Sequence, residues 1–283
     1  MEEKKDRLIN AVRNNQNIAE ELKGNIETLA ELIVANFPDY DYSNLQSVLS
    51  SLKIEFSDEI DAYSLYDRED NKICINTDLL SRNGVDFQHW FLGEMLKAST
   101  KIATGYEGYQ NAVTSEITSL INIDESRGAL DPEGRELISI FSGIVDPSII
   151  IGAYINGSVV DVITYLDSVG VPKQDFDAFA SSLNELHTSN TAFTTAETQL
   201  IEMYRKVIST KMVNGELDRN QASKTFAEFS TRLWYHRSKL ISLYEHHDFS
   251  NLEGFDNVEV ALLAATEELE SKANELSGSG YSK

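Results

Sequence analysis

The sequence predicts an α+β protein that is predominantly α-helical, and three features of its pattern point to this class. Apolar residues recur at helical spacing over most of the 283 residues. The one convincing β signal lies between Lys53 and Asn76, where apolar and polar residues alternate on both sides of a charged turn. The last third of the chain carries three long helical patterns separated by short turns, which is typical of an antiparallel bundle.

Residues 1–52 are expected to form an N-terminal helical region. Residues 2–36 predict a long helix or a helix pair, because one apolar stripe runs through a strongly charged segment. Pro38 disfavours helical geometry at the residue before it and therefore ends this segment. Ser43 or Asn44 then caps a short helix through Leu52.

A second region, residues 53–188, begins with the strands and contains the strongest helix of the first half, predicted over residues 86–104. One face of that helix is apolar, and a second stripe places His89, Gly93 and Lys97 four residues apart. A loop is expected over residues 105–110 and a helix over residues 110–123. Asp131 and Asp146 each precede a proline, which is the pattern of a helix N-terminus. The helices predicted after them span residues 132–144, 147–155, 158–169 and 173–187.

Short polar side chains over residues 188–195 mark a boundary, beyond which a three-helix bundle is expected over residues 189–277. Asp218 and Gln221 have the spacing of a capping box at the start of its second helix. The third helix is predicted over residues 256–276. The last residues, 278–283, are expected to be a disordered tail.

Composition excludes several classes of partner. The net charge is −22, with 46 acidic and 24 basic residues, whereas nucleic acids and anionic membranes select clusters of Lys and Arg. Cys74 is the one cysteine, so no internal disulfide is expected. The N-terminus lacks the apolar run of a signal peptide and no stretch has the apolar length of a membrane span, which predicts a cytoplasmic protein.

The central helix has one feature of a zinc-binding helix and lacks the rest. Such a helix needs two histidines at i and i+4, with a Glu beside the first as general base. Here Glu94 is present, but the two positions that would hold the histidines are occupied by Gly93 and Lys97. Lys97 lies three positions after Glu94, which favours an ion pair between them. His89 has Gly93 as its i+4 neighbour, so this helix supplies no second nitrogen.

The order of these parts resembles the zincin-type metallopeptidases, and is most similar to small bacterial members of that family. In those members a strand of the type Y…n.IyiN precedes a helix of the type HELLHaaS. The matching stretches here are residues 66–76 and 93–99, and the resemblance covers about residues 62–170. A second family motif, G-L-N-E-G-x-T-E, matches residues 108–115, where Gly108 and Thr114 are kept and Asn111 replaces the glutamate.

The resemblance implies that the three metal positions are Gly93, Lys97 and Asn111, and that only the base position, Glu94, is retained. Zinc needs three well-placed donors, and neither glycine nor protonated lysine supplies one. We therefore expect no bound metal or cofactor, with the Lys97 ammonium near the former metal position and paired with Glu94. We also expect helices 86–104 and 110–123 to pack side by side, with Gly93, Lys97 and Asn111 converging.

These residues leave three hypotheses for the function open. The preferred one is a zincin-like pseudo-metallopeptidase without catalytic activity, which binds a protein or peptide partner. The second is an active metal-dependent hydrolase that uses unconventional ligands such as His89, Glu94 and Glu116. The third is a purely helical interaction protein that is unrelated to zincins.

Overall fold

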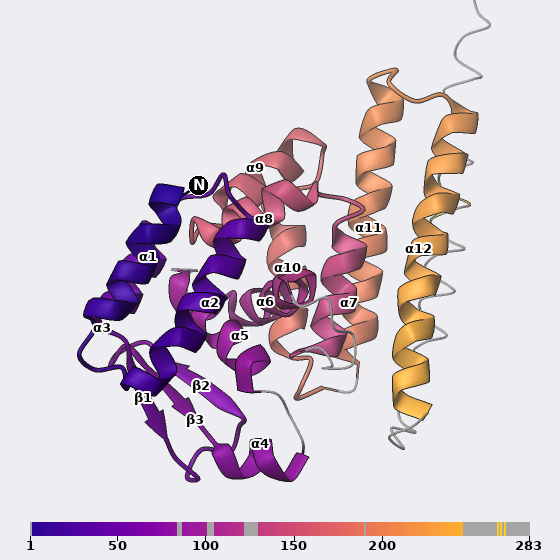
Figure 1. Ribbon diagram of the computed structural model, residues 1–283. Helices are drawn as coiled ribbons and strands as arrows, with labels where there is room; N and C mark the ends of the chain where they lie inside the picture. The colour runs from indigo at the N-terminus through magenta and orange to yellow at the C-terminus, as the bar shows by residue number, and fades with distance from the viewer. Residues whose placement is uncertain are drawn as a thin grey trace, which may run out of the picture. The chain divides into compact units, whose positions relative to one another are not determined.

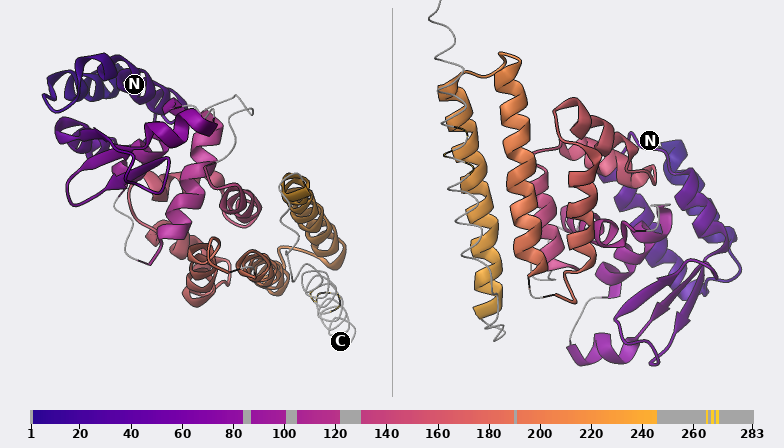
Figure 2. Two further views of the ribbon diagram at one scale, coloured as in Figure 1. Left: turned by 90° about the horizontal axis from the view of Figure 1, so that it is seen from below. Right: turned by 180° about the vertical axis from the view of Figure 1, so that it is seen from behind.

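A computed structural model describes residues 2–83, 87–100, 105–121, 130–189 and 191–245, together with 265, 267 and 269. The described chain is mainly helical and includes one small sheet (Figures 1 and 2). It divides into two compact units. Unit 1 comprises Met1–Ala103, Val113–Asp131 and Ile151–Ser158, and unit 2 comprises Thr104–Ala112, Pro132–Ile150 and Val159–Lys283. The sequence-based division into residues 1–52, 53–188 and 189–277 stays a prediction.

Three helices open unit 1: α1 (Glu2–Asn14), α2 (Glu20–Asn36) and α3 (Ser43–Ser51). Of the two alternatives predicted for residues 2–36, the helix pair is the one observed, and the break between the two helices covers residues 15–19. The Asn15 side chain is buried, and its Nδ2 donates to the backbone oxygens of Leu49 and Leu52 at 2.8 and 2.9 Å. This amide therefore ties the end of α1 to the end of α3.

The strands form a mixed three-stranded sheet of order β1-β3-β2. Its members are β1 (Lys53–Phe56), β2 (Ser64–Asp67) and β3 (Lys72–Ile75). The predicted hairpin is confirmed as the antiparallel pair β2–β3, and β1 extends it by pairing parallel to β3. At the charged turn, Asp67 Oδ1 accepts from the backbone N–H groups of Glu69 and Asp70. The turn carboxylate thus orders the backbone locally.

After α4 (Thr77–Asn83), the helix α5 (Phe87–Ser99) forms the centre of unit 1. Residues 91–96 are all buried, and α5 packs against β2, α3 and α2 (Figure 1). A helix that is buried on every side is a core helix, as its position at the centre of unit 1 requires. The next helix, α6 (Glu107–Ile121), starts three residues earlier than expected. The loop prediction for residues 105–110 is wrong from residue 107 onward, where α6 has already begun. Gly105, two residues before the helix, has a φ of 98°.

The proline-based predictions hold for α7 (Pro132–Phe141) and α8 (Pro147–Ile155). Asp146 Oδ1 accepts from the backbone N–H of Ser148 at 2.8 Å, as a residue at a helix N-terminus should. The following helices are α9 (Val160–Ser168) and α10 (Lys173–Asn184). The N-cap position of α9 is Val159, one residue after the predicted Ser158. Gly170, with φ of 85°, ends that segment as predicted.

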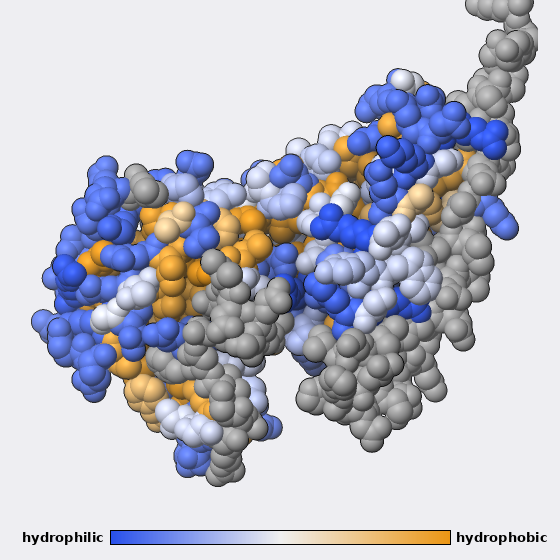
Figure 3. Space-filling model, turned by 45° about the vertical axis from the view of Figure 1, so that its right-hand side comes forward, coloured by the Kyte–Doolittle hydropathy of each residue, from blue (hydrophilic) through white to orange (hydrophobic). Residues whose placement is uncertain are grey.

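Two long helices, α11 (Ala192–Val213) and α12 (Arg219–Glu245), lie side by side in unit 2 (Figures 1 and 2). The predicted capping box is confirmed: Asp218 and Gln221 exchange hydrogen bonds at 2.8 and 2.9 Å. The third predicted helix, 256–276, lies outside the described residues except for Ala265, Glu267 and Leu269, and so does the tail. The face that Figure 3 shows carries both hydrophilic and hydrophobic residues among those described. Within the described residues, no helix is both long and apolar enough to cross a bilayer.

Candidate functional site

Glu94 is the residue around which the candidate site in unit 1 is built. It lies in the middle of α5, and only 3% of its surface is exposed. Its carboxylate accepts three hydrogen bonds, from the Tyr66 backbone N–H at 2.9 Å, the Ser64 hydroxyl at 3.3 Å and the Lys97 ammonium at 3.1 Å. Two of these donors belong to β2. The carboxylate is therefore the link that fastens the central helix to the sheet.

The predicted pair of Glu94 and Lys97 is confirmed. The nitrogen of Lys97 lies 3.1 Å from Glu94 Oε1, and 28% of the lysine side chain is exposed. A carboxylate with so little access to water would be costly without donors and a positive charge nearby. Lys97 supplies that charge at the position where the resemblance places a metal-ligating histidine.

At Gly93, the other histidine position, the neighbouring space is filled. A Cβ atom built there would lie 2.3 Å from Cδ1 of Leu130. Real Cβ atoms do not approach a carbon this closely, so any side chain at residue 93 requires Leu130 to move. An apolar side chain thus occupies the space into which a ligand at residue 93 would project.

The third position, Asn111, belongs to unit 2, whereas Gly93 and Lys97 belong to unit 1. Asn111 is half-buried on α6. Convergence of these three residues therefore stays a prediction.

The unconventional ligand set of His89, Glu94 and Glu116 is not gathered into one site. His89 is buried on α5, five residues before Glu94. Five residues correspond to a rotation of about 140° around a helix, so the two side chains leave α5 on different sides. Among the described residues, no group of three or more His, Cys, Asp or Glu side chains has an arrangement suited to a metal ion.

Sequence reasoning missed one residue that lies within the electrostatic influence of Glu94. Tyr154 lies in the apolar helix α8, is fully buried, and shares a hydrogen bond of 2.6 Å with the Thr114 hydroxyl. Burial raises the pKa of Tyr154, the Thr114 hydrogen bond lowers it, and the negative charge of Glu94 raises it further. The Tyr154 hydroxyl therefore stays protonated and serves as a neutral hydrogen-bonding group. A tyrosine within an otherwise apolar helix is the only trace of this role in the sequence.

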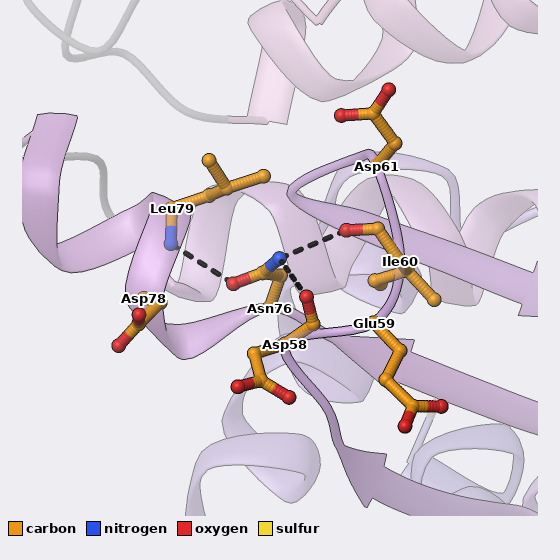
Figure 4. A pocket seen from close by; sticks show the side chains of 7 residues that line it. All are labelled: Asp58, Glu59, Ile60, Asp61, Asn76, Asp78 and Leu79. Carbon is orange, nitrogen blue, oxygen red and sulfur yellow. Dashed lines mark hydrogen bonds between the residues drawn. The ribbon is translucent and has the colours of Figure 1, made fainter.

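Unit 1 also has a hollow of about 320 Å³, lined by residues from the β1–β2 connection and the start of α4. Four carboxylates surround it, those of Asp58, Glu59, Asp61 and Asp78, and they point in different directions (Figure 4). The side chain of Asn76, which also lines the hollow, already has hydrogen-bond partners. Its Nδ2 donates to Ile60 O at 2.9 Å, and its Oδ1 accepts from the Leu79 N–H at 3.0 Å. The hollow therefore provides negative charge without the convergent donors of a cation site.

Comparison with known proteins adds no relative: no protein-family model, no curated protein and no solved structure matches this chain.

Proposed function

We propose that this chain is a cytoplasmic, non-catalytic binding module for a protein or peptide, in which a zincin-like arrangement of strand and helix serves as scaffold. The observation that carries the proposal is that the Glu94 carboxylate already accepts three hydrogen bonds within the protein. A general base needs a lone pair directed at a water or a substrate. The carboxylate of Glu94 instead accepts from two groups of β2 and from Lys97.

The surroundings of Glu94 support the same proposal. Lys97 carries a positive charge where a metal ligand would need a lone pair, and Leu130 fills the space beside Gly93. Each of these features stabilises the packing of unit 1 and opposes the binding of a metal ion next to Glu94. The scaffold is thereby compatible with binding and poorly suited to hydrolysis.

A mixed library of fluorogenic peptides tests the proposal when it is assayed with and without added Zn²⁺. We expect no chelator-sensitive cleavage, and we expect Glu94→Gln to change the stability of the protein instead of any turnover. Zinc-dependent cleavage that disappears in a Glu94→Gln variant of unchanged stability would refute the proposal and favour the hydrolase. Glu202, which is half-exposed on α11, provides the matched control as Glu202→Gln.

A second candidate, a helical interaction protein unrelated to zincins, is favoured by two exposed aromatic residues of α12. Trp234 and Tyr235 are 38% and 57% exposed there. Arg237 lies over the Trp234 ring at 4.8 Å and Lys239 over the Tyr235 ring at 4.7 Å. Exposed aromatic residues beside cations are typical of protein interfaces. Loss of partner binding in Trp234→Ala, with peptide binding by unit 1 absent, would favour this candidate.

A further inference from the structure

The two edges of the sheet in unit 1 differ in their capacity to accept another strand. The edge strand β2 is closed where it meets α5, because the outward N–H of Tyr66 donates to Glu94. The other edge strand is β1, and among the described elements β3 is the one with which it makes extensive contact. An added strand would therefore meet a side-chain carboxylate at β2 and backbone groups at β1.

The pairing of β1 with β3 defines which backbone groups point outward. The N–H of Lys53 donates to Asn71 O at 3.0 Å, and the N–H of Ser57 donates to Ile75 O at 2.9 Å. Because backbone groups alternate in direction along a strand, the N–H and C=O groups of Ile54 and Phe56 point away from β3. These two N–H groups and two C=O groups are the ones with which an added strand would form hydrogen bonds.

Phe56 gives this edge an apolar contact surface. Its side chain is 51% exposed, although its Cα partner across the sheet, Ile75, is fully buried. Ile54, two residues earlier on the same face of β1, is half-buried. An extended peptide that pairs with β1 would place alternate side chains beside Ile54 and Phe56, and burial of an aromatic ring is a common source of affinity in such contacts.

The charge beyond the end of β1 selects among such peptides. Asp58 and Glu59 follow Phe56 after one intervening residue, and both line the acidic hollow of Figure 4. Two residues of an extended chain span about 7 Å. A peptide residue that lies two positions beyond the contact with Phe56 therefore comes level with Asp58. Asp58 and Glu59 are both exposed, so Lys or Arg is favoured at this peptide position and Asp or Glu is repelled.

We propose that the outer edge of β1 binds an extended peptide as an additional strand, with an apolar side chain against Phe56 and a basic side chain beside Asp58 and Glu59. This inference rests on the proposed binding function and specifies the class of partner, an extended apolar segment flanked by Lys or Arg. Main-chain hydrogen bonds with Ile54 and Phe56 provide the docking, and the flanking charge provides the selectivity.

Two labelled peptides test the proposal by fluorescence anisotropy with the full chain. Both alternate valine and threonine over six residues, and they carry either an arginine or a glutamate at each end. We expect the arginine peptide to bind at least about tenfold more tightly than the glutamate peptide. The double variant Asp58→Asn with Glu59→Gln should abolish this preference, whereas Glu21→Gln, a charge change on the exposed face of α2, should preserve it.

Two further variants test the edge itself. Ile54→Pro removes an outward N–H without affecting the bonds to β3, and proline is tolerated on edge strands. Phe56→Thr removes the aromatic contact. We expect each to weaken binding of the arginine peptide about tenfold, whereas Leu65→Thr, equally exposed at 52% on the closed strand β2, should change binding less than about twofold.

Binding that survives both β1 variants, or that is lost in Leu65→Thr, would refute docking at β1 and leave the proposed binding function intact. Failure of both peptides to bind would also refute the β1 site, whereas the proposed function is judged separately by the zinc-dependent cleavage assay. If Ile54→Pro proves unfolded by circular dichroism, an arginine peptide with alternate backbone amides N-methylated replaces it. Unreduced binding of that methylated peptide would contradict strand addition.

Discussion

Gly108 on α6 packs directly against the backbone at the end of α10 in unit 2, and a single methyl group there should be strongly destabilising. A Cβ atom at residue 108 would lie 2.3 Å from the Leu183 carbonyl carbon and 2.4 Å from the Asn184 nitrogen. Both are backbone atoms of α10, so no side-chain rotation relieves the overlap. The Gly108 N–H also donates to Asn184 Oδ1 at 2.6 Å, and Asn184 Nδ2 donates to Gly105 O at 2.8 Å.

The expected cost of Gly108→Ala follows from these distances. Ordinary contacts of a Cβ atom begin near 3.4 Å, so α6 must move by about 1 Å relative to α10, and overpacking of this kind costs about 1–3 kcal/mol. The same movement weakens two hydrogen bonds, at about 0.5–1.5 kcal/mol each. The higher helix propensity of alanine offsets at most about 1 kcal/mol of this destabilisation. We therefore expect the free energy of unfolding to fall by about 2–4 kcal/mol.

Urea unfolding followed by far-UV circular dichroism measures this change, and Gly24 provides the matched control. Gly24 lies inside α2, and no atom lies within 4 Å of the position that an alanine methyl group would take there. Gly24→Ala should therefore raise the free energy of unfolding by about 0.5–1 kcal/mol. The packing argument is refuted if Gly108→Ala is as stable as the unchanged protein, or if both substitutions have the same sign.

Three further predictions concern single carboxylates. Glu94→Ala should lower the free energy of unfolding by about 2–4 kcal/mol in urea titrations, because it leaves the Tyr66 N–H without its acceptor; a loss below about 0.5 kcal/mol would contradict the structural role. Burial raises the pKa of Glu197 from 4.5 to about 8, although Arg237 lowers it. The native state therefore holds a proton that the unfolded chain releases between these values, and stability falls by about 1.4 kcal/mol per pH unit as the pH rises through that window. Glu197→Gln should remove this slope when unfolding is measured from pH 5 to 8, and an unchanged slope would show that other groups cause it. Asp146→Ala should cost about 1 kcal/mol through loss of the cap of α8, measured as a lowered thermal midpoint, and an unchanged midpoint would assign no stabilising role to the cap.

Within the described residues, most helices and the hairpin were predictable because their signals are local. Helical periodicity, a proline after an aspartate and alternation around a charged turn all act within a few residues. The Glu94–Lys97 pair belongs to the same category, since three residues along a helix bring two side chains together. The start of α6 was mispredicted because Gly108 favours a loop locally, whereas its place in α6 depends on packing against the backbone of α10, 76 residues away.

The sequence by itself determined the elements and the i, i+3 partner of the central carboxylate. Only the tertiary structure decided that Glu94 fastens α5 to β2, that β1 joins the sheet parallel to β3, and that Gly108 meets the backbone of α10. Each of these contacts joins residues far apart in the chain, 28 residues for Glu94 with Tyr66 and 76 for Gly108 with Asn184. Such contacts depend on how preformed elements pack against one another, and neither periodicity nor spacing along the chain encodes that choice.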